Sequence, residues 1–305
     1  MSTLITKPGA VYDMPEHAYH ADPCPASSIS GTMAATIMQP GGLAKLKTKK
    51  QIEPTPAMRL GSAAHAVTLG AGPALVMDEY MTPSGAQSTK AEAKEWRAKQ
   101  EAKGLQVVTP AMYEKAHTMA EIVHSHPEVS QMFSGGRAEV SIFDYDQAAR
   151  VWLRGRIDYI TNRKLVIDYK TTNDASQHTF WRNIGYRGYH VQAAHYMRIA
   201  RRLDLINEDA TWMWIAQETE APYLVAVYEL DTDDLERSIQ VDELAIKRWA
   251  RALAADEWPG YPTKPVTLRL AEWMFPDVEE LAKVDEALAA AEFDAAINTI
   301  EKEAA

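Results

Sequence analysis

The sequence predicts an α+β fold in which helices flank a central mixed β-sheet. Three consecutive stretches, 137–145, 150–160 and 164–170, are rich in Val, Ile, Tyr and Trp, which favour β-strands. Helical patterns precede and follow these stretches, and two further strand patterns come later in the chain. This order of elements is typical of one α+β domain built around a mixed sheet.

The composition is that of an ordinary globular protein. Of 305 residues, 46% are hydrophobic and 24% are charged, which excludes a disordered or fibrous chain. No apolar run approaches the ~20 residues that cross a bilayer, because His65 and Pro73 interrupt the best candidate, 63–77. The first residues lack the pattern of a secretory signal, so we expect a cytoplasmic location. Because Cys24 is the only cysteine, metal ligands would have to be Asp, Glu or His.

Charge is distributed unevenly along the chain. The net charge is -10, yet residues 150–202 carry eleven Lys and Arg against three Asp and Glu. Residues 203–305 carry eight Lys and Arg against 24 Asp and Glu. A basic segment within an acidic protein indicates either a site for an anionic ligand or a solvated charged face. Composition alone leaves both interpretations open.

The first half of the chain shows mainly helical patterns. We predict a short helix and a loop within 26–60, a helix of small residues over 61–69, and two outer helices over 89–103 and 110–126. Hydroxyl side chains near the start of the first of these segments can cap a helix. The small residues of the second helix allow close packing, and His65 is the one polar side chain in its middle.

The second half alternates strands and helices. The three strand patterns are separated by turn-forming Asp146 and Asn162, so a meander is their simplest arrangement. Beyond them we predict a helix over 179–203, strands over 210–217 and 222–230, and helices over 232–255 and 277–304. We expect a single domain, 1–305, with its core at about 26–262 and an extension at 263–305 that holds a strand and an acidic helix.

Two aspartates and a lysine carry the candidate chemistry. Asp158 lies near the end of the second predicted strand, and Asp168 and Lys170 lie in the third. Residues two apart on a strand share a face, so the Asp168 and Lys170 side chains are neighbours. If the two strands pair antiparallel, Asp158 approaches Asp168, and two carboxylates that close repel unless a cation joins them. Mg²⁺ suits such a site because it prefers oxygen ligands, and the Lys170 amine could orient or deprotonate a water or neutralise phosphoryl charge.

The residues before Asp168 distinguish this motif from a lone Asp-x-Lys, which is common on solvated strands. Leu165, Val166 and Ile167 form an apolar run. Asp168 and Lys170 therefore occur where a buried strand emerges, a position that is costly for unpaired charges.

The combined motifs resemble the PD-(D/E)xK nuclease superfamily. The resemblance rests on His65 in GlySerAlaAlaHisAlaValThrLeu, on GlyArgIleAsp ending at Asp158, on IleAspTyrLysThrThr, and on TyrHisValGlnAlaAlaHisTyr ending at Tyr196. The chain is most similar to the RecE-type, exonuclease VIII-like branch, which is related to lambda exonuclease and to the RecB nuclease domain. The likeness extends from about Ser28 to TrpProGlyTyr at 258–261.

The resemblance implies a PD-(D/E)xK restriction-endonuclease-like core and a Mg²⁺-dependent exonuclease. Such enzymes digest one strand of linear double-stranded DNA from its 5′ end, release mononucleotides and leave a 3′ overhang. The resemblance further implies two Mg²⁺ ions per active site, with Mn²⁺ able to substitute. It also implies a ring-shaped homo-oligomer, a trimer or tetramer, that passes the overhang to a single-strand annealing protein.

The resemblance assigns roles to individual residues. Asp158 and Asp168 become metal ligands, together with the His65 side chain and the backbone carbonyl of Tyr169, and Lys170 becomes the catalytic lysine. For His65, the alternative is a hydrogen-bonded core histidine.

Further members of the implied site lie on a helix and on the first strand. Gln192 and Tyr196 are four residues apart and share a helix face beside the active site, with Tyr189 one turn earlier. Tyr189 could equally dock the helix on the sheet. Glu139 matches an acidic residue that some members place near the metal, although glutamates at strand ends are usually solvated.

DNA contacts are implied for a third set of residues. These are Ser28, Ser30, Arg154, Arg156, Thr171 and Tyr189, of which the two serines could help to hold the 5′ phosphate. The chain departs from the superfamily pattern at two positions. Ile157 stands where the superfamily has proline, and the second acid is Asp168 rather than Glu, which shortens its reach by one methylene.

Two other functions remain open at this point. One is a nuclease-like scaffold that binds DNA without catalysis, although the intact Asp158, Asp168 and Lys170 argue against it. The other is an endonuclease of the same superfamily, which the His65 and Gln192–Tyr196 motifs disfavour.

Overall fold

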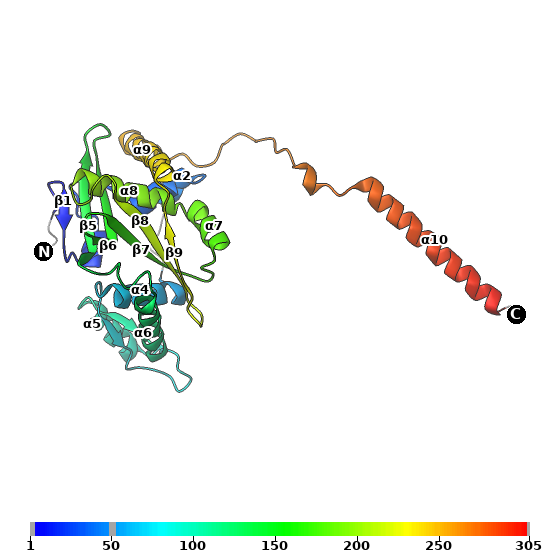
Figure 1. The fold of residues 1–305 in the computed structure, drawn as a ribbon, viewed down its shortest axis with the longest axis horizontal. Helices are drawn as coiled ribbons and strands as arrows, with labels where there is room; N and C mark the ends of the chain where they lie inside the picture. Colours follow the sequence, from blue (N-terminus) through cyan, green and yellow to red (C-terminus); the bar gives the residue numbers. More distant parts are fainter. Residues whose placement is uncertain (1–3, 49–52, 304–305) are drawn as a thin grey trace. The chain divides into compact units, whose positions relative to one another are not determined.

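A mixed β-sheet organises the first and larger part of the molecule (Figure 1). The computed structural model describes residues 4–48 and 53–303, and the chain divides into two units, Met1–Gly260 and Tyr261–Ala305. In the described residues the sheet follows the order β1-β5-β6-β7-β8-β9, and β2 pairs with β6. Its strands are β1 (Gly9–Val11), β2 (Ile29–Ser30), β5 (Gly136–Asp146), β6 (Val151–Thr161), β7 (Leu165–Thr172), β8 (Thr211–Glu218) and β9 (Val225–Glu229).

The predicted meander is confirmed in β5, β6 and β7, which pair antiparallel with their neighbours in chain order. Arg150 lies in the first connecting turn, and Asn162 and Arg163 form the second. All three have positive φ, of 56°, 51° and 58°, and tight connections between strands require such backbone conformations. β7 then pairs parallel with β8, and β8 pairs antiparallel with β9. The sheet is therefore mixed, as the sequence predicts.

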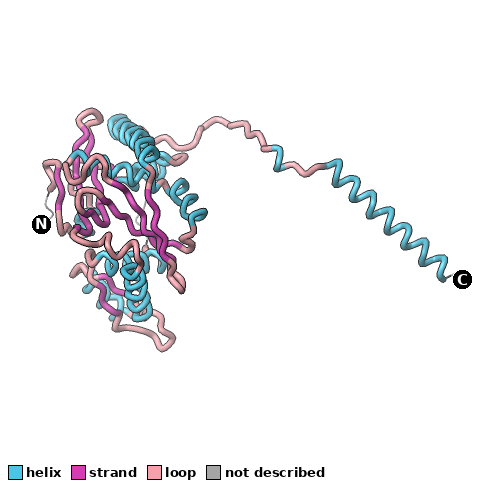
Figure 2. Tube along the Cα trace, viewed as in Figure 1, coloured by secondary structure: helices cyan, strands magenta, loops and turns pink. Residues whose placement is uncertain are grey.

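Helices cover both faces of the sheet (Figure 2). On one face, α2 (Gly31–Met38), α8 (Tyr189–Arg202) and α9 (Thr232–Ala255) contribute side chains to a core that includes Val166 of β7. On the other face, α4 (Pro56–Leu69) and α6 (Pro110–Ser125) pack on the next residue of β7, Ile167. Successive β7 side chains therefore enter opposite cores, which is why this strand reads as a continuous apolar run.

The helix predicted over 179–203 is wrong as a single element. The structure has α7 (Gln177–Arg187) and α8, separated by Gly188, whose φ is 70°. A Cβ at this position would lie 2.8 Å from the Cβ of Ala35, so a side chain would also collide with α2. Glycine is favoured here for its left-handed backbone and for the close approach of α2.

Several short elements surround this core. In the predicted 26–60 segment, the Ser30 hydroxyl accepts a hydrogen bond from the backbone N–H of Met33 and caps α2, and a second helix follows. No strand was predicted before residue 137, yet β1, β2, β3 (Leu75–Met77) and β4 (Gln106–Val108) all lie there. The remaining elements of this unit are α1 (Glu16–His20), α3 (Gly42–Lys47) and α5 (Ala91–Glu101).

The second unit consists of a loop, a short 3-10 turn and one long helix. The turn is η1 (Glu272–Met274), and the helix is α10 (Val278–Glu303). The described residues of this unit contain no strand, so the strand expected within 263–305 is not formed there. Among the described residues, no helix is both long and apolar enough to cross a membrane.

Candidate active site

Three carboxylates form a row across three neighbouring strands. Ala138 lies opposite Tyr159 and Val140 lies opposite Ile157, which places Glu139 opposite Asp158. Tyr159 lies opposite Ile167, which in turn places Asp158 opposite Asp168. Residues opposite one another on antiparallel strands share a face. The register therefore brings together Glu139 of β5, Asp158 of β6 and Asp168 of β7, which we call the acidic row.

Regular strand pairing is interrupted at the acidic row. The β6–β7 ladder ends at Tyr159 and Ile167, and the backbone N–H of Tyr169 instead donates to the Asp158 carboxylate at 2.9 Å. Glu139 has a φ of 54°, in the left-handed region that residues other than glycine rarely adopt. Strain of this kind concentrates at functional sites, where the surrounding structure enforces it.

Three basic side chains balance the acidic row. His65 lies between two of the acids, with Nδ1 3.1 Å from Glu139 Oε1 and Nε2 3.0 Å from Asp158 Oδ2. Arg156 forms an ion pair with Glu139, and Lys170 Nζ lies 2.6 Å from Asp168 Oδ2. With an imidazolium at His65, the six side chains carry no net charge.

α4 delivers His65 to the sheet. The helix begins with Pro56 at its first position, and the Thr55 hydroxyl accepts from the N–H of Met58. Gly61, one turn before His65, permits a close approach, because a Cβ there would lie 2.9 Å from the Thr171 hydroxyl. The small-residue pattern that predicts this helix therefore also explains how it packs against β7.

Burial and neighbouring charges shift the pKa values of the site in opposite directions. Burial alone would lower the pKa of His65, but Asp158 and Glu139 raise it to about 9. Burial works against ionisation of Asp158 as well, yet the His65 and Lys170 charges hold its pKa below the usual value. Burial and the Asp158 charge raise the pKa of Asp168 to about 6, although Lys170 opposes the shift. The pKa of Lys170 is raised despite its burial, because Asp168 and Asp158 stabilise the ammonium form.

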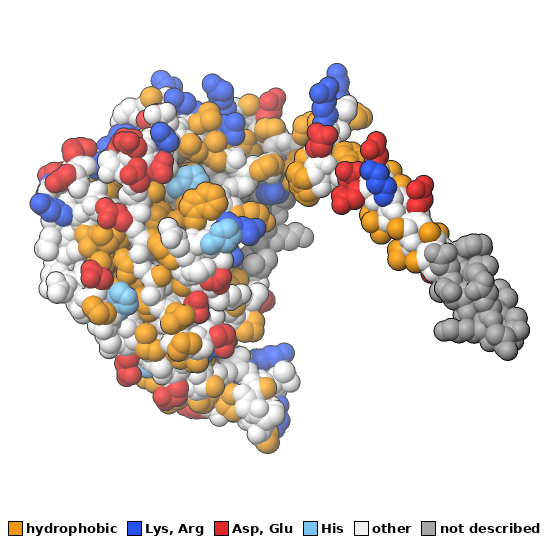
Figure 3. Space-filling model, turned by 45° about the vertical axis from the view of Figure 1, so that its right-hand side comes forward, with side chains coloured by type: hydrophobic (Ala, Val, Ile, Leu, Met, Phe, Trp, Pro, Cys, Tyr) orange, Lys and Arg blue, Asp and Glu red, His pale blue; other side chains and the backbone are white. Residues whose placement is uncertain are grey.

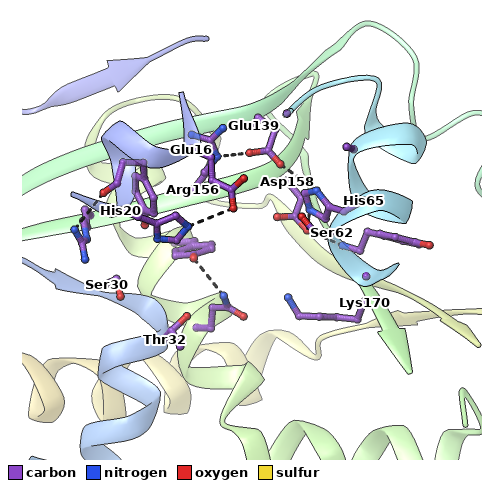
Figure 4. A pocket seen from close by; sticks show the side chains of 18 of the residues that line it. Glu16, His20, Ser30, Thr32, Ser62, His65, Glu139, Arg156, Asp158 and Lys170 are labelled. Carbon is purple, nitrogen blue, oxygen red and sulfur yellow. Dashed lines mark hydrogen bonds and ion pairs between the residues drawn. The ribbon is translucent and has the colours of Figure 1, made fainter. Parts of the chain in front are cut away.

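The site opens into a cavity of about 770 Å³ (Figure 4). Figure 4 shows His65, Glu139 and Asp158 facing one another at one side of this space, with Lys170 extending into it. Gln192 and Tyr196 of α8 also line the cavity, and the Gln192 amide donates to the Tyr196 hydroxyl at 3.2 Å. Burial raises the pKa of Tyr196 well above its usual range, so its hydroxyl remains protonated.

The residues implied in DNA contacts do not all reach the cavity. Ser30, Arg154, Arg156 and Thr171 line it. Ser28 is buried outside the lining, where its hydroxyl donates to Asp22 Oδ1 at 2.8 Å.

Arg154 and Tyr189 lie at two edges of the site. Arg154 is held by Asp22, with 3.3 Å between the guanidinium and the carboxylate. The Tyr189 ring lies under the Lys170 ammonium, 5.2 Å from ring centroid to nitrogen, and borders a second cavity. This contact is in the range of a cation–π interaction.

The donors of the cavity fit a divalent metal ion. His65, Glu139 and Asp158 each offer one ligand atom, and these atoms lie within 4.8 Å of one another. The two carboxylates suit Mg²⁺ or Mn²⁺, and the imidazole adds a nitrogen ligand of the kind that transition metals prefer. Glu139, for which the sequence gives the least support, belongs to this cluster. Asp168, also a predicted ligand, lies outside this three-residue cluster and pairs with Lys170.

Sequence reasoning missed a wall of the cavity that comes from the N-terminal segment. Glu16, Tyr19 and His20 of α1 line the cavity, and the His20 ring lies 3.6 Å from Glu16. α1 has only five residues and shows no clear periodicity. Its proximity to the cavity depends on contacts between distant parts of the chain, such as the hydrogen bond from Arg156 to the Met14 carbonyl.

Solved structures share parts of this fold. A suspected exonuclease from Eubacterium rectale superposes with a TM-score of 0.55 at 12% identity, covering 80% of this chain and 91% of that one. A phage-related exonuclease from Haemophilus somnus gives a TM-score of 0.32 at 11% identity, covering 75% of this chain and 96% of its own. An alkaline exonuclease from Laribacter hongkongensis gives a TM-score of 0.24 at 14% identity, covering 66% of this chain and 95% of that one. At these identities the Eubacterium rectale protein supports the fold alone, and the other two superpose too weakly to add to it.

A comparison with curated proteins finds no match. A family model, the PDDEXK-like domain of unknown function (DUF3799), matches residues 32–269. This range contains the acidic row, His65, Lys170 and α8. The PD-(D/E)xK resemblance of the sequence motifs is thereby confirmed, and the chain belongs to this PDDEXK-like family.

Proposed function

We propose that this protein is a Mg²⁺-dependent exonuclease that hydrolyses one strand of linear double-stranded DNA from its 5′ end and leaves a 3′ overhang. The observation that carries the proposal is the charge-balanced acidic row, of which Glu139 and Asp158 line an open cavity together with His65 and Lys170. A fold that lacked catalysis would have no need to hold three carboxylates together at broken strand pairing. The exonuclease description of the Eubacterium rectale protein agrees with this class of reaction.

In this proposal each residue has a defined task. His65, Asp158 and Glu139 hold the metal, and Asp168 and the Tyr169 carbonyl complete the site. A bound divalent ion would supply Lewis-acid polarisation of the phosphoryl group and of a water. Because its pKa is raised, Lys170 remains an ammonium ion, which suits stabilisation of phosphoryl charge better than proton abstraction. Gln192 and Tyr196 orient the nucleotide through their hydrogen-bonded side chains.

The proposal extends to the assembly and the partner of the enzyme. We expect a ring-shaped homo-oligomer, a trimer or tetramer, which acts in the cytoplasm and passes the overhang to a single-strand annealing protein. A ring around the duplex would keep the enzyme on one DNA end through many cycles. Light scattering on the full chain gives the oligomeric state, and a monomer at all concentrations would contradict the ring.

One experiment separates the candidate functions. Linear and covalently closed circular duplex DNA are incubated with the protein and Mg²⁺, and the reactions are repeated with EDTA. An exonuclease digests only the linear DNA and stops in EDTA, whereas an endonuclease cuts both forms and a scaffold cuts neither. Linear DNA labelled at either the 5′ or the 3′ end then tests polarity, since early release of the 5′ label is expected. Early release of the 3′ label would contradict the proposed direction.

A further inference from the structure

A second cavity adjoins the catalytic cavity. It has a volume of about 1,090 Å³, and Gly61, Ser62, Lys170 and Thr171 line both spaces. Lys170 thus lies at the boundary between them. A chain that occupied the catalytic cavity could continue past Lys170 into the second one. We call the second cavity the α7 groove, because α7 forms one of its walls.

One face of α7 lines the groove, and its rim is aromatic and basic. Thr179, Asn183 and Arg187 are spaced by four residues and all line the groove. Tyr186 precedes Arg187 and is 83% exposed, although it is a large aromatic side chain. Arg182 lies one turn before Tyr186 on the same side of the helix. Figure 3 brings the side of the molecule that carries α7 forward and shows apolar and basic side chains next to one another there.

The two arginines of α7 differ from most arginines of the basic segment 150–202. Within the described residues, neither Arg182 nor Arg187 forms an ion pair. Six other arginines of the segment are paired with acids of this chain, namely Arg154, Arg156, Arg163, Arg198, Arg201 and Arg202. The positive charge of the segment is therefore mostly neutralised within the fold. The guanidinium groups of Arg182 and Arg187 on α7 remain available to bind an external anion.

The acids beside the groove are already engaged. The Asp174 carboxylate accepts from the Ser176 N–H and the Thr179 hydroxyl at the start of α7. Glu220 forms an ion pair of 2.9 Å with Lys115. Neither acid cancels the charge of Arg182 and Arg187 by direct pairing. The groove therefore combines available cations with an exposed ring, which is the chemistry that recognises an unpaired nucleic acid strand.

We propose that the α7 groove binds single-stranded DNA that is continuous with the strand in the catalytic cavity. A base stacks on Tyr186, and phosphates contact Arg182 and Arg187. A base inside a duplex has both faces covered by its stacked neighbours and cannot stack on Tyr186, so the groove selects single strands over duplex. The link to hydrolysis rests on the proposed function, whereas the binding itself does not.

The test measures binding of fluorescent oligo(dT) to the full chain in EDTA, where no digestion is expected. Tyr186→Ala should weaken binding by about 5- to 150-fold, the range for loss of one stacked base. Replacing Arg182 and Arg187 by Gln should reduce the slope of log affinity against log salt by about 0.7 for each arginine. Blunt duplex of the same length should compete poorly.

Two matched variants control for nonspecific effects. Trp181→Ala removes a 70% exposed aromatic side chain from another face of α7, and Arg251→Gln removes one positive charge from α9. Both should bind oligo(dT) as the unmodified protein does. Unchanged binding in Tyr186→Ala, equal losses in Trp181→Ala, or equal competition by duplex would each overturn the proposal. A protein that binds through Tyr186 but cuts no DNA would support the groove and contradict only the proposed function.

Discussion

Two histidine–aspartate pairs in this protein have similar geometry and different surroundings. His65 Nε2 lies 3.0 Å from Asp158, and His195 Nδ1 lies 2.8 Å from Asp242. The His65 side chain is 25% exposed and borders a cavity, whereas His195 and Asp242 are fully buried between α8 and α9. His65 has a second carboxylate at its other nitrogen, while His195 Nε2 has no hydrogen-bond partner among the described residues.

The difference shows that the residue pair by itself does not indicate a catalytic site. What distinguishes His65 and Asp158 is access from a cavity, a second carboxylate at the histidine and interrupted strand pairing. The His195–Asp242 pair joins two helices and has no route for a ligand. We therefore expect changes around the first pair to affect rate, and changes at the second pair to affect stability.

The largest expected effect is on catalysis. Lys170→Ala should slow DNA hydrolysis by ~10²- to 10⁴-fold, the range for a positioned charged or proton-transferring group, while binding of DNA ends is retained. Lys164→Ala, in the exposed turn before β7, is the matched control and should leave the rate unchanged. Initial rates on end-labelled linear duplex provide the measurement. Full activity in Lys170→Ala would remove this residue from the mechanism.

The buried pair should show the reverse behaviour. His195→Ala leaves the Asp242 carboxylate buried, and its remaining basic neighbour among the described residues is Arg198, at 3.8 Å. Removing one partner of a buried pair typically costs about 3–5 kcal/mol of unfolding free energy, which urea denaturation can measure. The rate per folded molecule should change little. A large loss of rate without a loss of stability would mean that His195 belongs to the active site.

The sequence predicts those parts of the fold that depend on local patterns. β5, β6 and β7 follow from runs of Val, Ile and Tyr, and their pairing brings Asp158, Asp168 and Lys170 together as expected. The break at Gly188 could not be predicted this way, because an isolated glycine in a helical pattern costs only about 1 kcal/mol. The reason for this glycine lies in Ala35, which is distant in the sequence.

The remainder of the site depends on register and on long-range contacts. Glu139 joins the metal cluster because β5 aligns it with Asp158, and no local pattern specifies that alignment. The same limit applies to α1, whose Glu16 and His20 reach the cavity from the N-terminal segment. The basic segment also had two interpretations, and the structure shows that ion pairs within the chain account for most of its arginines.

The third prediction concerns the pH dependence of stability that the His65–Asp158 pair causes. In the metal-free protein, the pKa of His65 is raised from 6.5 to about 9. The stability that its charge contributes is complete below pH 6.5 and is lost as pH rises through 9, at most about 3 kcal/mol. Urea denaturation in EDTA at intervals from pH 6 to pH 9.5 should show this decline. Stability that rises over the same range would contradict the shift.

Two additions sharpen this experiment. His65→Gln keeps a polar side chain of similar length without a titrating group, so the decline above pH 6.5 should disappear in that variant. Mg²⁺ should stabilise the unmodified protein more at pH 9 than at pH 6.5, because a metal ligand histidine must be neutral. An equal effect of Mg²⁺ at both pH values would argue against His65 as a ligand.

The smallest expected effect concerns α8, which contributes one residue to the buried pair and the next to the active-site cavity. His195 faces α9, and the next residue, Tyr196, faces the cavity. Gly155 of β6 makes room for Tyr196, since a Cβ there would lie 2.8 Å from Tyr196 Cδ1 and 3.0 Å from Ile142 Cγ1. Gly155→Ala should therefore cost about 1–2 kcal/mol through overpacking, and it should lower the rate severalfold by displacing Tyr196 from Gln192.

Gly9→Ala is the matched control for this change. Gly9 also lies in a strand of the sheet, and a Cβ there meets nothing within 4 Å. We expect neither stability nor rate to change in this variant. If Gly155→Ala loses stability but keeps its full rate, Tyr196 packs α8 onto the sheet without orienting the substrate. Tyr196 would then belong with the buried His195–Asp242 pair and not with the active site.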